Sequence, residues 1–290
     1  MSGDESVSAA ERSEETFFRY WAKTAQNDPL SFHLLPFHLL DVAAVTTRLL
    51  QRRPQLRRYL AGLLDLAEDD VVICAAFMMA LHDIGKLDPG FQARSPDTFE
   101  ALRGTPPLAK PYHHHTQTGL ALWRHRVRPQ VVGLLAPSAI EPRTEDDDHL
   151  DSWAHAVLHH HGRPEPELDL GRGGRRLTRL FAPDDLSACD DLVRGIADVL
   201  GLSGLAPLQM CAPRASARRA SWILAGVSVL TDWLGSNQSW FELRSQPTSL
   251  TNYWHHVALP AADRALRSTS VLPVPARQLT RPHALLKWPE

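Results

Sequence analysis

Apolar residues recur with helical spacing along most of the chain, and the longest run without a charge covers residues 71–81, "VVICAAFMMAL". Because this run is apolar on every side, it predicts a helix buried in the centre of the fold. The helix is expected to extend from about Asp70 to Lys86 and to end at the turn signal "DPG". Further apolar helices are predicted over residues 37–50, directly after Pro36, and over residues 220–235.

Shorter helical patterns cover residues 113–123 and 152–162, whereas residues 93–112 contain four prolines and are expected to form a loop. Alternating strand patterns are nearly absent, so the sequence predicts an all-α fold. The predicted organisation is one helical domain over residues 17–262. A polar, disordered tail over residues 1–16 precedes it, and a proline-rich tail or linker over residues 263–290 follows it.

Composition narrows the classes of protein that the chain can represent. The formal net charge is −2, so no overall basic field attracts nucleic acid, and any such contact must come from local patches. The three cysteines are scattered, which is typical of a reducing cytoplasm rather than of a disulfide framework. The N-terminus has no signal-peptide pattern, and the longest apolar run is shorter than the roughly 20 residues of a membrane span. We therefore expect a cytoplasmic protein without a membrane partner.

Ionisable residues stand beside these apolar runs. They are His38 in the first, His82 and Asp83 after the second, the triplet 159–161, and Asp232 after the last. A charge buried in such surroundings must be paired, hydrogen-bonded or bound to a metal. Neutral imidazoles with a minority of carboxylates suit Mn, Fe, Co, Ni or Zn, and they suit Mg²⁺ less well.

The spacing of His82, Asp83 and Lys86 indicates a specific chemistry. Adjacent residues lie about 100° apart on a helix, so the Asp83 carboxylate could bridge two ions. Two such ions form the usual clamp for hydrolysis of a phosphodiester. Lys86 would share the face of His82 and Asp83, where its ammonium could hold a phosphate oxygen or orient a water. The alternative is that Lys86 only complements the dipole of the helix C-terminus.

Five segments in chain order carry a family resemblance. "ALHDIGKLDPGFQ" resembles the HD-superfamily signature in the form found in the nuclease domain of the CRISPR-associated helicase-nuclease of type I systems. "YWAKT" with "FHLLPFHLLDVAAV" is similar to the opening motif of that family, and "HHHTQTG" to its middle motif. "LHHHGRP" and "LTDWLGSNQSWF" resemble its last two motifs.

The resemblance implies an HD-type helical bundle that binds two divalent transition-metal ions and cleaves single-stranded DNA. By motif, it implies seven metal ligands: His38, His82, Asp83, His115, His160, His161 and Asp232. It implies catalytic roles for Asp83, as a bridging ligand, and for Lys86, as a phosphate or water contact. The implied partners are single-stranded DNA, the type I CRISPR surveillance complex, and a helicase domain or subunit in cis or in trans.

Several alternatives stay open at this point. The chain has no Walker A pattern, so it is expected to be either a separate nuclease subunit or a nuclease domain without its helicase. The HD signature also occurs in nucleotide phosphohydrolases and cyclic-nucleotide phosphodiesterases, which is a second hypothesis for the function. A third hypothesis is a catalytically silent recruitment module. Asp41 either orients His38 or is a capping or solvated residue. His113, His114 and His159 are expected around the ligands or at the surface. Trp222, Trp233 and Trp240 are expected in the core.

Overall fold

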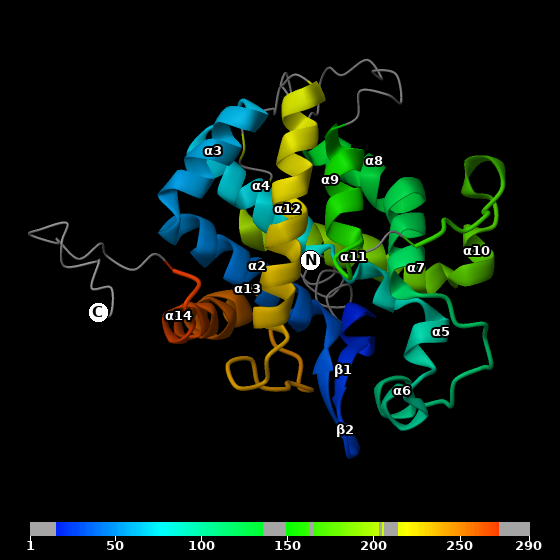
Figure 1. Cartoon of the computed structure of the whole chain (residues 1–290). Coiled ribbons are helices and arrows are strands. Elements are labelled where there is room, and N and C mark those ends of the chain that lie inside the picture. The colour runs from blue at the N-terminus through cyan, green and yellow to red at the C-terminus, as the bar shows by residue number, and fades with distance from the viewer. Residues whose placement is uncertain (1–15, 136–148, 163–164, 203–204, 206–213, 273–290) are drawn as a thin grey trace, which may run out of the picture.

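The computed structural model describes residues 16–135, 149–162, 165–202, 205 and 214–272 (Figure 1). Within these ranges the chain is mostly helical, and its two strands form one short antiparallel hairpin, which agrees with the predicted all-α class. The strands are β1 (Trp21–Ala25) and β2 (Asp28–Leu34). The α-helices are α2 (Leu35–Arg52), α3 (Pro54–Leu64), α4 (Glu68–Ala80), α5 (Pro89–Gln92), α6 (Pro96–Arg103), α7 (His115–Leu122), α8 (Arg128–Leu135), α9 (His149–Leu158), α10 (Leu177–Leu180), α11 (Pro183–Leu200), α12 (Arg214–Gly235), α13 (Leu250–Tyr253) and α14 (Leu259–Ser268). Shorter helical turns are η1 (Phe17–Arg19), η2 (Ile84–Leu87), η3 (Trp123–Val127), η5 (Arg172–Gly174) and η7 (Trp254–Ala258).

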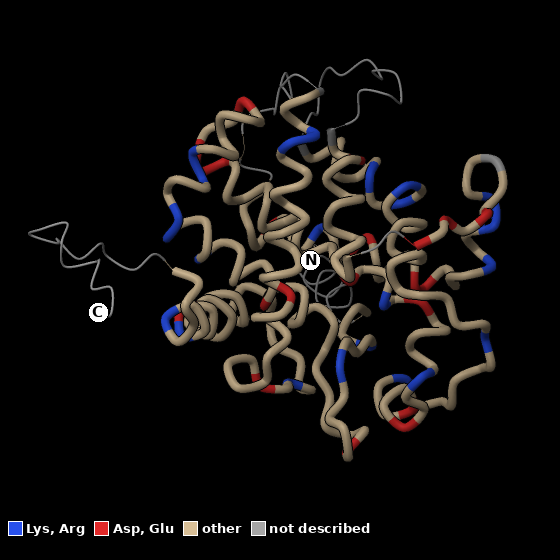
Figure 2. Tube along the Cα trace, in the orientation of Figure 1, with Lys and Arg blue, Asp and Glu red and all other residues tan. Residues whose placement is uncertain are grey.

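Helices α2 and α4 pack against each other at the centre of the fold, and α12 and α14 also pack on α2. α2 has Pro36 in its first turn, where the missing N–H removes no helical hydrogen bond. α4 begins with three acidic residues, whose charge is favourable at a helix N-terminus. Charged positions are absent from the middle of α4 and α12, and most of the others lie toward the outside of the fold (Figure 2). None of the described helices has the length and apolarity needed to cross a membrane.

The central helix is shorter than the sequence predicts, because α4 ends at Ala80 rather than near Lys86. The backbone N–H of His82 donates to the Met79 carbonyl oxygen at 3.2 Å, and His82 Nδ1 lies 2.9 Å from that oxygen. Carbonyl groups in the last turn of a helix lack partners within the helix, and here an imidazole supplies one. His82 and Asp83 therefore lie in a turn beyond the helix, and Lys86 lies in η2.

The β1–β2 hairpin was not expected from the sequence, because its strands are too short to show clear alternation. Its register is fixed by contacts with distant segments. The Leu34 N–H donates to the Arg244 carbonyl oxygen at 3.0 Å. The Gln92 side-chain amide donates to the carbonyl oxygens of Trp21, at 2.8 Å, and of Lys86, at 2.7 Å. The hairpin is thereby attached beside the turn that contains Lys86.

One predicted loop and one predicted domain boundary also differ from the structure. The segment 93–112 contains α6, which begins with Pro96 and ends where Gly104 takes a left-handed conformation. The C-terminal boundary expected at residue 262 falls inside α14, whose Ala261, Ala262, Ala265 and Leu266 are buried, so the helix continues because its apolar face packs on α2. The tails expected over residues 1–16 and 263–290 lie mostly outside the described residues.

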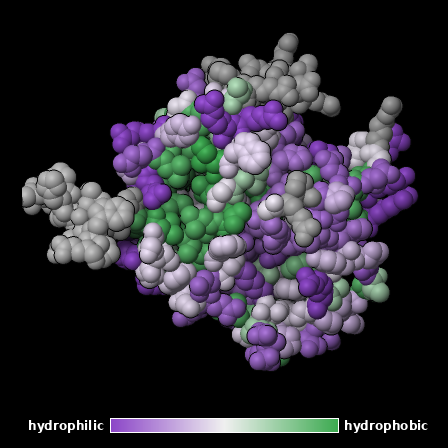
Figure 3. Space-filling model, in the orientation of Figure 1, coloured by the Kyte–Doolittle hydropathy of each residue, from purple (hydrophilic) through white to green (hydrophobic). Residues whose placement is uncertain are grey.

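The prediction that Trp222, Trp233 and Trp240 belong to the core is wrong for the first two, which lie on α12. Trp222 is 77% exposed and Trp233 is 72% exposed, whereas Trp240 is partly buried. The apolar run of α12 is continuous, so its sequence does not reveal which side faces inward. Figure 3 shows apolar surface beside α12.

Candidate metal centre

The seven residues proposed as metal ligands come from five separate segments and meet in one cluster, in which His161 is exposed, Asp232 is partly buried and the other five are buried. His38 lies on α2, and His82 and Asp83 follow α4. His115 begins α7, and Asp232 lies near the end of α12. The other two, His160 and His161, follow the end of α9. The imidazoles and carboxylates converge because each lies beside an apolar segment that packs in the core.

One half of the cluster contains His38, His82 and Asp232. The Nε2 atoms of His38 and His82 are 3.2 Å apart. Asp232 Oδ1 is 3.5 Å from His82 Nε2 and 3.9 Å from His38 Nε2. These three groups offer two nitrogens and one oxygen, all within 4.8 Å of one another, which is a spacing suited to one metal ion. We call this half of the cluster site A.

The other half contains His115 and His161, with His160 next to them; the ligand atom of His160 also lies within 4.8 Å of those of His82 and Asp83, so this ring adjoins both halves of the cluster. The Nε2 atoms of His115 and His161 are 2.9 Å apart. The rings of His160 and His161 are close neighbours, with centroids separated by 4.2 Å. We call this half of the cluster site B.

The carboxylate of Asp83 lies between site A and site B. Its Oδ2 is 3.0 Å from His38 Nε2 and 3.3 Å from His82 Nε2. Its Oδ1 is 3.2 Å from His115 Nε2 and 3.7 Å from His160 Nε2. The Oδ1 atom is buried, and the structure gives it no hydrogen bond of good geometry. A carboxylate with one oxygen toward each group of imidazoles has the geometry of a bridging ligand.

The orientation of the rings also fits metal binding. His82 Nδ1 is 2.9 Å from the Met79 carbonyl oxygen, and His160 Nδ1 is 3.2 Å from the Val157 carbonyl oxygen. In both rings Nδ1–H is therefore the donor, and Nε2 faces the centre, as is usual for histidine ligands. Two imidazole nitrogens that face each other at 2.9–3.2 Å require a proton or a cation between them. The donor set of five imidazoles and two carboxylates suits a divalent transition metal.

Burial and charge set the protonation of the cluster. Burial lowers the pKa of His115 to about 3 and that of His160 to about 4, although Asp83 opposes the shift in both. Both rings are thus neutral near pH 7, as metal ligands must be. Burial would raise the pKa of Asp83, but the Lys86 ammonium and His82 hold it well below its usual value. The cluster therefore keeps an ionised carboxylate at its middle.

His82 differs from the other rings of the cluster. Burial would lower its pKa, but Asp83 and Asp232 raise the pKa to about 9. At pH 7 and without a metal, we therefore expect His82 to be protonated and to pair with the carboxylates of Asp83 and Asp232. A cation in site A would have to displace this proton, so metal binding there releases H⁺.

Lys86 contacts the bridging carboxylate directly. Its Nζ is 2.6 Å from Asp83 Oδ2 and donates to the Ala22 carbonyl oxygen at 3.2 Å. Lys23, on β1, is a second ammonium close to the cluster, and it was not predicted from the sequence. Burial and the neighbouring Lys86 lower the pKa of Lys23 to about 8. The pairing of β1 with β2 could have revealed Lys23 only if the hairpin had been predicted.

Asp41, His114 and His159 lie around the cluster and differ in their contacts with it. Asp41 does not orient His38, because its carboxylate is 2.9 Å from His33 Nε2 and accepts from the Tyr253 hydroxyl at 2.8 Å. His114 is partly buried and stacks on His115, with centroids 4.4 Å apart. It also lies close enough to His115 and His161 to be a further candidate ligand. By contrast, His159 Nδ1 is 2.9 Å from the His155 carbonyl oxygen.

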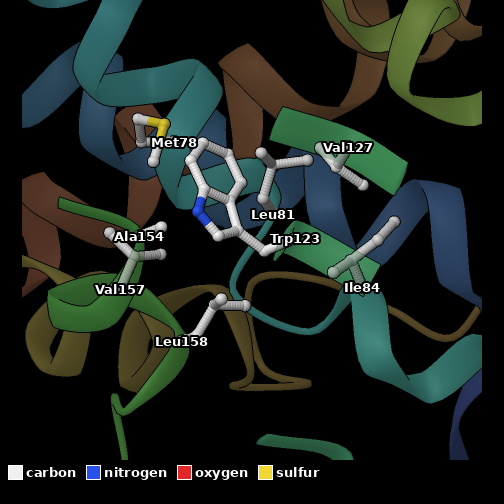
Figure 4. A pocket seen from close by; sticks show the side chains of 8 residues that line it. All are labelled: Met78, Leu81, Ile84, Trp123, Val127, Ala154, Val157 and Leu158. Atoms are coloured by element: carbon white, nitrogen blue, oxygen red, sulfur yellow. The ribbon is translucent and has the colours of Figure 1, made fainter. Parts of the chain in front are cut away.

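An apolar cluster fixes the two segments that precede the central ligands. Leu81 comes directly before His82, and Leu158 comes two residues before His160. Both pack around the indole of Trp123, together with Met78, Ile84, Val127, Ala154 and Val157 (Figure 4). The space between these side chains has no room for a water molecule. Such close packing restricts the backbone just before His82 and just before His160. The packing therefore holds these two imidazoles in position even when no metal is bound.

Comparison with known proteins supplies a family for this geometry. A sequence model of the family described as "Cas3, HD domain" matches residues 21–241. The CRISPR-associated endonuclease/helicase Cas3 of Thermus thermophilus is 30% identical over 240 residues, which are 81% of this chain and 24% of that protein. The chain spans about a quarter of the length of the curated relatives that it matches.

Solved structures share the fold. A crystal structure of a CRISPR-associated protein superimposes with a TM-score of 0.72 and 25% identity, over 93% of this chain and 29% of that one. The Thermus thermophilus Cas3 HD domain, crystallised in the presence of Ni²⁺, gives a TM-score of 0.58 and 24% identity, over 88% of this chain and 90% of that one. The match to the family model covers most of the helical domain and includes all seven residues of the cluster. The chain belongs to the family of Cas3 HD domains.

Proposed function

We propose that the chain is a metal-dependent nuclease that cleaves single-stranded DNA by hydrolysis of phosphodiester bonds with two divalent ions. The observation that carries the proposal is the position of Asp83, which has one oxygen toward the imidazoles of site A and the other toward those of site B. His38, His82 and Asp232 would hold one ion, and His115, His160 and His161 the other. The donor set favours Mn, Fe, Co or Ni, allows Zn and suits Mg²⁺ less.

Bound ions would supply an activated water near neutral pH and would neutralise charge on the phosphoryl oxygens. The protein contributes the positions of the groups around them. Asp83 orients both sites through its two oxygens. Lys86, at 2.6 Å from Asp83, would hold a non-bridging phosphate oxygen or orient the attacking water. Neutral imidazoles at His115 and His160 keep site B ready for a cation at pH 7.

Membership of the family of Cas3 HD domains supports a biological role for this nuclease activity. The nuclease would act as the target-degrading component of type I CRISPR antiviral interference in the cytoplasm. Its partners would be a surveillance complex that delivers the DNA and a helicase, in the same polypeptide or in another, that supplies the single strand.

The test is cleavage of circular single-stranded DNA, measured with Mn²⁺, Fe²⁺, Co²⁺, Ni²⁺, Zn²⁺ or Mg²⁺ and with a chelator. We expect cleavage with transition metals, none with the chelator, and none in His82→Ala or Asp83→Ala. His255→Ala and Asp97→Ala change exposed residues of the same types and should retain full activity. Circular dichroism should show the same helical content in all variants. Cleavage that persists in Asp83→Ala would refute the assignment.

Two outcomes would favour other functions of an HD domain. Hydrolysis of mononucleotides or cyclic nucleotides, with circular DNA left intact, would indicate a nucleotide phosphohydrolase or phosphodiesterase. A well-folded protein that takes up no metal would indicate a recruitment module without catalysis.

A further inference from the structure

An open groove lies directly beside the metal centre, on the side of the β1–β2 hairpin. Its volume is about 390 Å³, within the usual size range of ligand sites. Two metal-centre residues, Lys86 and His115, form its inner wall. The other lining residues are Trp21, Ala22, Thr24, Phe91, Arg94 and Ser95. A ligand in this groove would therefore be continuous with one bound at the metal centre.

Arg94 is the cation at the outer part of this groove. Its guanidinium carbon is 5.7 Å from the centre of the Phe91 ring and 5.1 Å from the centre of the Tyr112 ring. Among the described residues it has no carboxylate within 4.0 Å. Arg94 is exposed, and Tyr112 is 47% exposed. A guanidinium held by two rings, without an acidic partner, is an available site for an anion.

Cationic and aromatic groups form a continuous series from the metal centre to the surface. Lys86 Nζ is 2.6 Å from Asp83 Oδ2 and 5.5 Å from the centre of the Phe91 ring. Phe91 is followed by Arg94, and Arg94 by Tyr112. Alternating cations and aromatic rings are the combination with which proteins bind single-stranded nucleic acid. The cations contact successive phosphates, and the rings stack on bases.

We propose that this groove binds the part of a nucleic-acid strand next to the bond that is cleaved. The Arg94 guanidinium contacts a phosphate beyond the one at the metal centre, and the exposed ring of Tyr112 stacks on a base. This inference rests on the proposed nuclease function, because it assumes a strand at the metal centre. It gives the site a preference for a strand of several nucleotides over a single nucleotide.

The test measures binding separately from cleavage. The affinity of a fluorescent oligothymidylate of twelve nucleotides is measured by anisotropy in the presence of a chelator, at several salt concentrations. We expect Arg94→Ala and Tyr112→Ala each to weaken binding by about 5- to 20-fold, the range of one phosphate or one stacked base. Arg94→Ala should also lower the slope of log affinity against log salt by about 0.7, whereas Tyr112→Ala should leave the slope unchanged.

Matched variants make the result specific. Arg58→Ala and Tyr59→Ala remove an exposed arginine and an exposed tyrosine from α3 and should bind like the parent. Tyr112→Phe keeps the ring and should also bind like the parent. The metal content of Arg94→Ala and Tyr112→Ala should equal that of the parent, and a loss of metal would mean that these residues support the metal centre instead.

The proposal that the groove binds nucleic acid is refuted if the parent does not bind the oligonucleotide, or if neither Arg94→Ala nor Tyr112→Ala weakens binding. Failure of the proposed function has a different signature. If binding depends on Arg94 and Tyr112 but circular DNA stays intact with every metal, the groove stands and the nuclease assignment fails.

Discussion

The backbone of Gly85 lies directly against the backbone of His115. A Cβ atom placed on Gly85 would be 1.9 Å from the His115 carbonyl oxygen and 2.4 Å from the backbone nitrogen of Gly119. The Thr118 hydroxyl donates to the Gly85 carbonyl oxygen at 3.0 Å. The turn that follows His82 and Asp83 and the first turn of α7 are thus in contact at a position where only glycine fits. This contact sets the distance between the ligands on these two segments.

Gly85→Ala should therefore separate these two segments and disrupt the metal centre. We expect the free energy of unfolding to fall by about 2–4 kcal/mol, since the added methyl group meets backbone atoms that cannot move aside locally. Metal content should fall in the same variant. Urea denaturation and elemental analysis measure the two effects. Gly62→Ala is the matched control because it adds a Cβ inside α3 with no atom within 4 Å. It should be neutral or stabilise by up to about 1 kcal/mol.

Metal stoichiometry should depend on which ligand is removed. Asp232→Ala should lose the ion of site A, and His161→Ala that of site B, so each should keep about one equivalent. Asp83→Ala should lose both, because its two oxygens face the two sites. Elemental analysis after equilibration with Mn²⁺ or Ni²⁺ measures the counts. Equal loss in all three variants would indicate a single cooperative site.

The network of Tyr253, Asp41 and His33 should contribute to stability. Asp41 is fully buried, and the Tyr253 hydroxyl donates to its Oδ1 at 2.8 Å. Tyr253→Phe removes this donor and leaves a buried carboxylate oxygen without it, which should cost about 1–3 kcal/mol in urea denaturation. Tyr59→Phe changes a half-exposed tyrosine and should stay within about 0.5 kcal/mol of the parent. A loss of the same size in both variants would argue against a specific role of the network.

The stability of the protein should respond to pH through Asp88. Burial raises its pKa from 3.8 to about 6, although it caps α5 by accepting from the Phe91 N–H. Because the folded state binds this proton more tightly than the unfolded state, the contribution of Asp88 is most favourable below pH 3.8 and is lost as pH rises through 6.

Asp88→Asn keeps a capping oxygen and removes the charge. We expect the variant to be more stable than the parent by roughly 1–3 kcal/mol at pH 8 and equally stable near pH 4, in urea denaturation with a chelator. A gain that is the same at both pH values would show that the carboxylate is not destabilised by burial.

The convergence of most candidate ligands could be predicted, because they lie in or directly after apolar segments that must pack in the core. The apolar run before His82 must be buried, and so must the apolar part of α12 before Asp232. Because both segments pack in the same core, the polar residues at their ends lie close together. The local conformation at His82 could not be predicted. It depends on the capture of the Met79 carbonyl oxygen by the imidazole, which competes with continuation of the helix.

Features that depend on contacts between distant segments were also missed. The pairing of Lys23 with His33 in the hairpin depends in part on the backbone of Arg244, which is more than 200 residues away. Arg94, which lines the groove, and Tyr112, which contacts the Arg94 guanidinium, lie in a proline-rich segment that was predicted to be a loop. The exposure of Trp222 and Trp233 follows from which face of α12 the other helices cover, and an uninterrupted apolar run carries no information on this choice.

The imidazole of His33 has a practical consequence for producing the protein. Every candidate ligand precedes residue 233, but the Arg244 N–H donates to His33 Nδ1, and Asp41 needs the hydroxyl of Tyr253. We expect a recombinant fragment that stops soon after Asp232 to contain every candidate ligand and still be less stable, because His33 and Asp41 would lose their partners at Arg244 and Tyr253. Expression boundaries for domains of this kind should therefore be chosen beyond α14, not at the last motif.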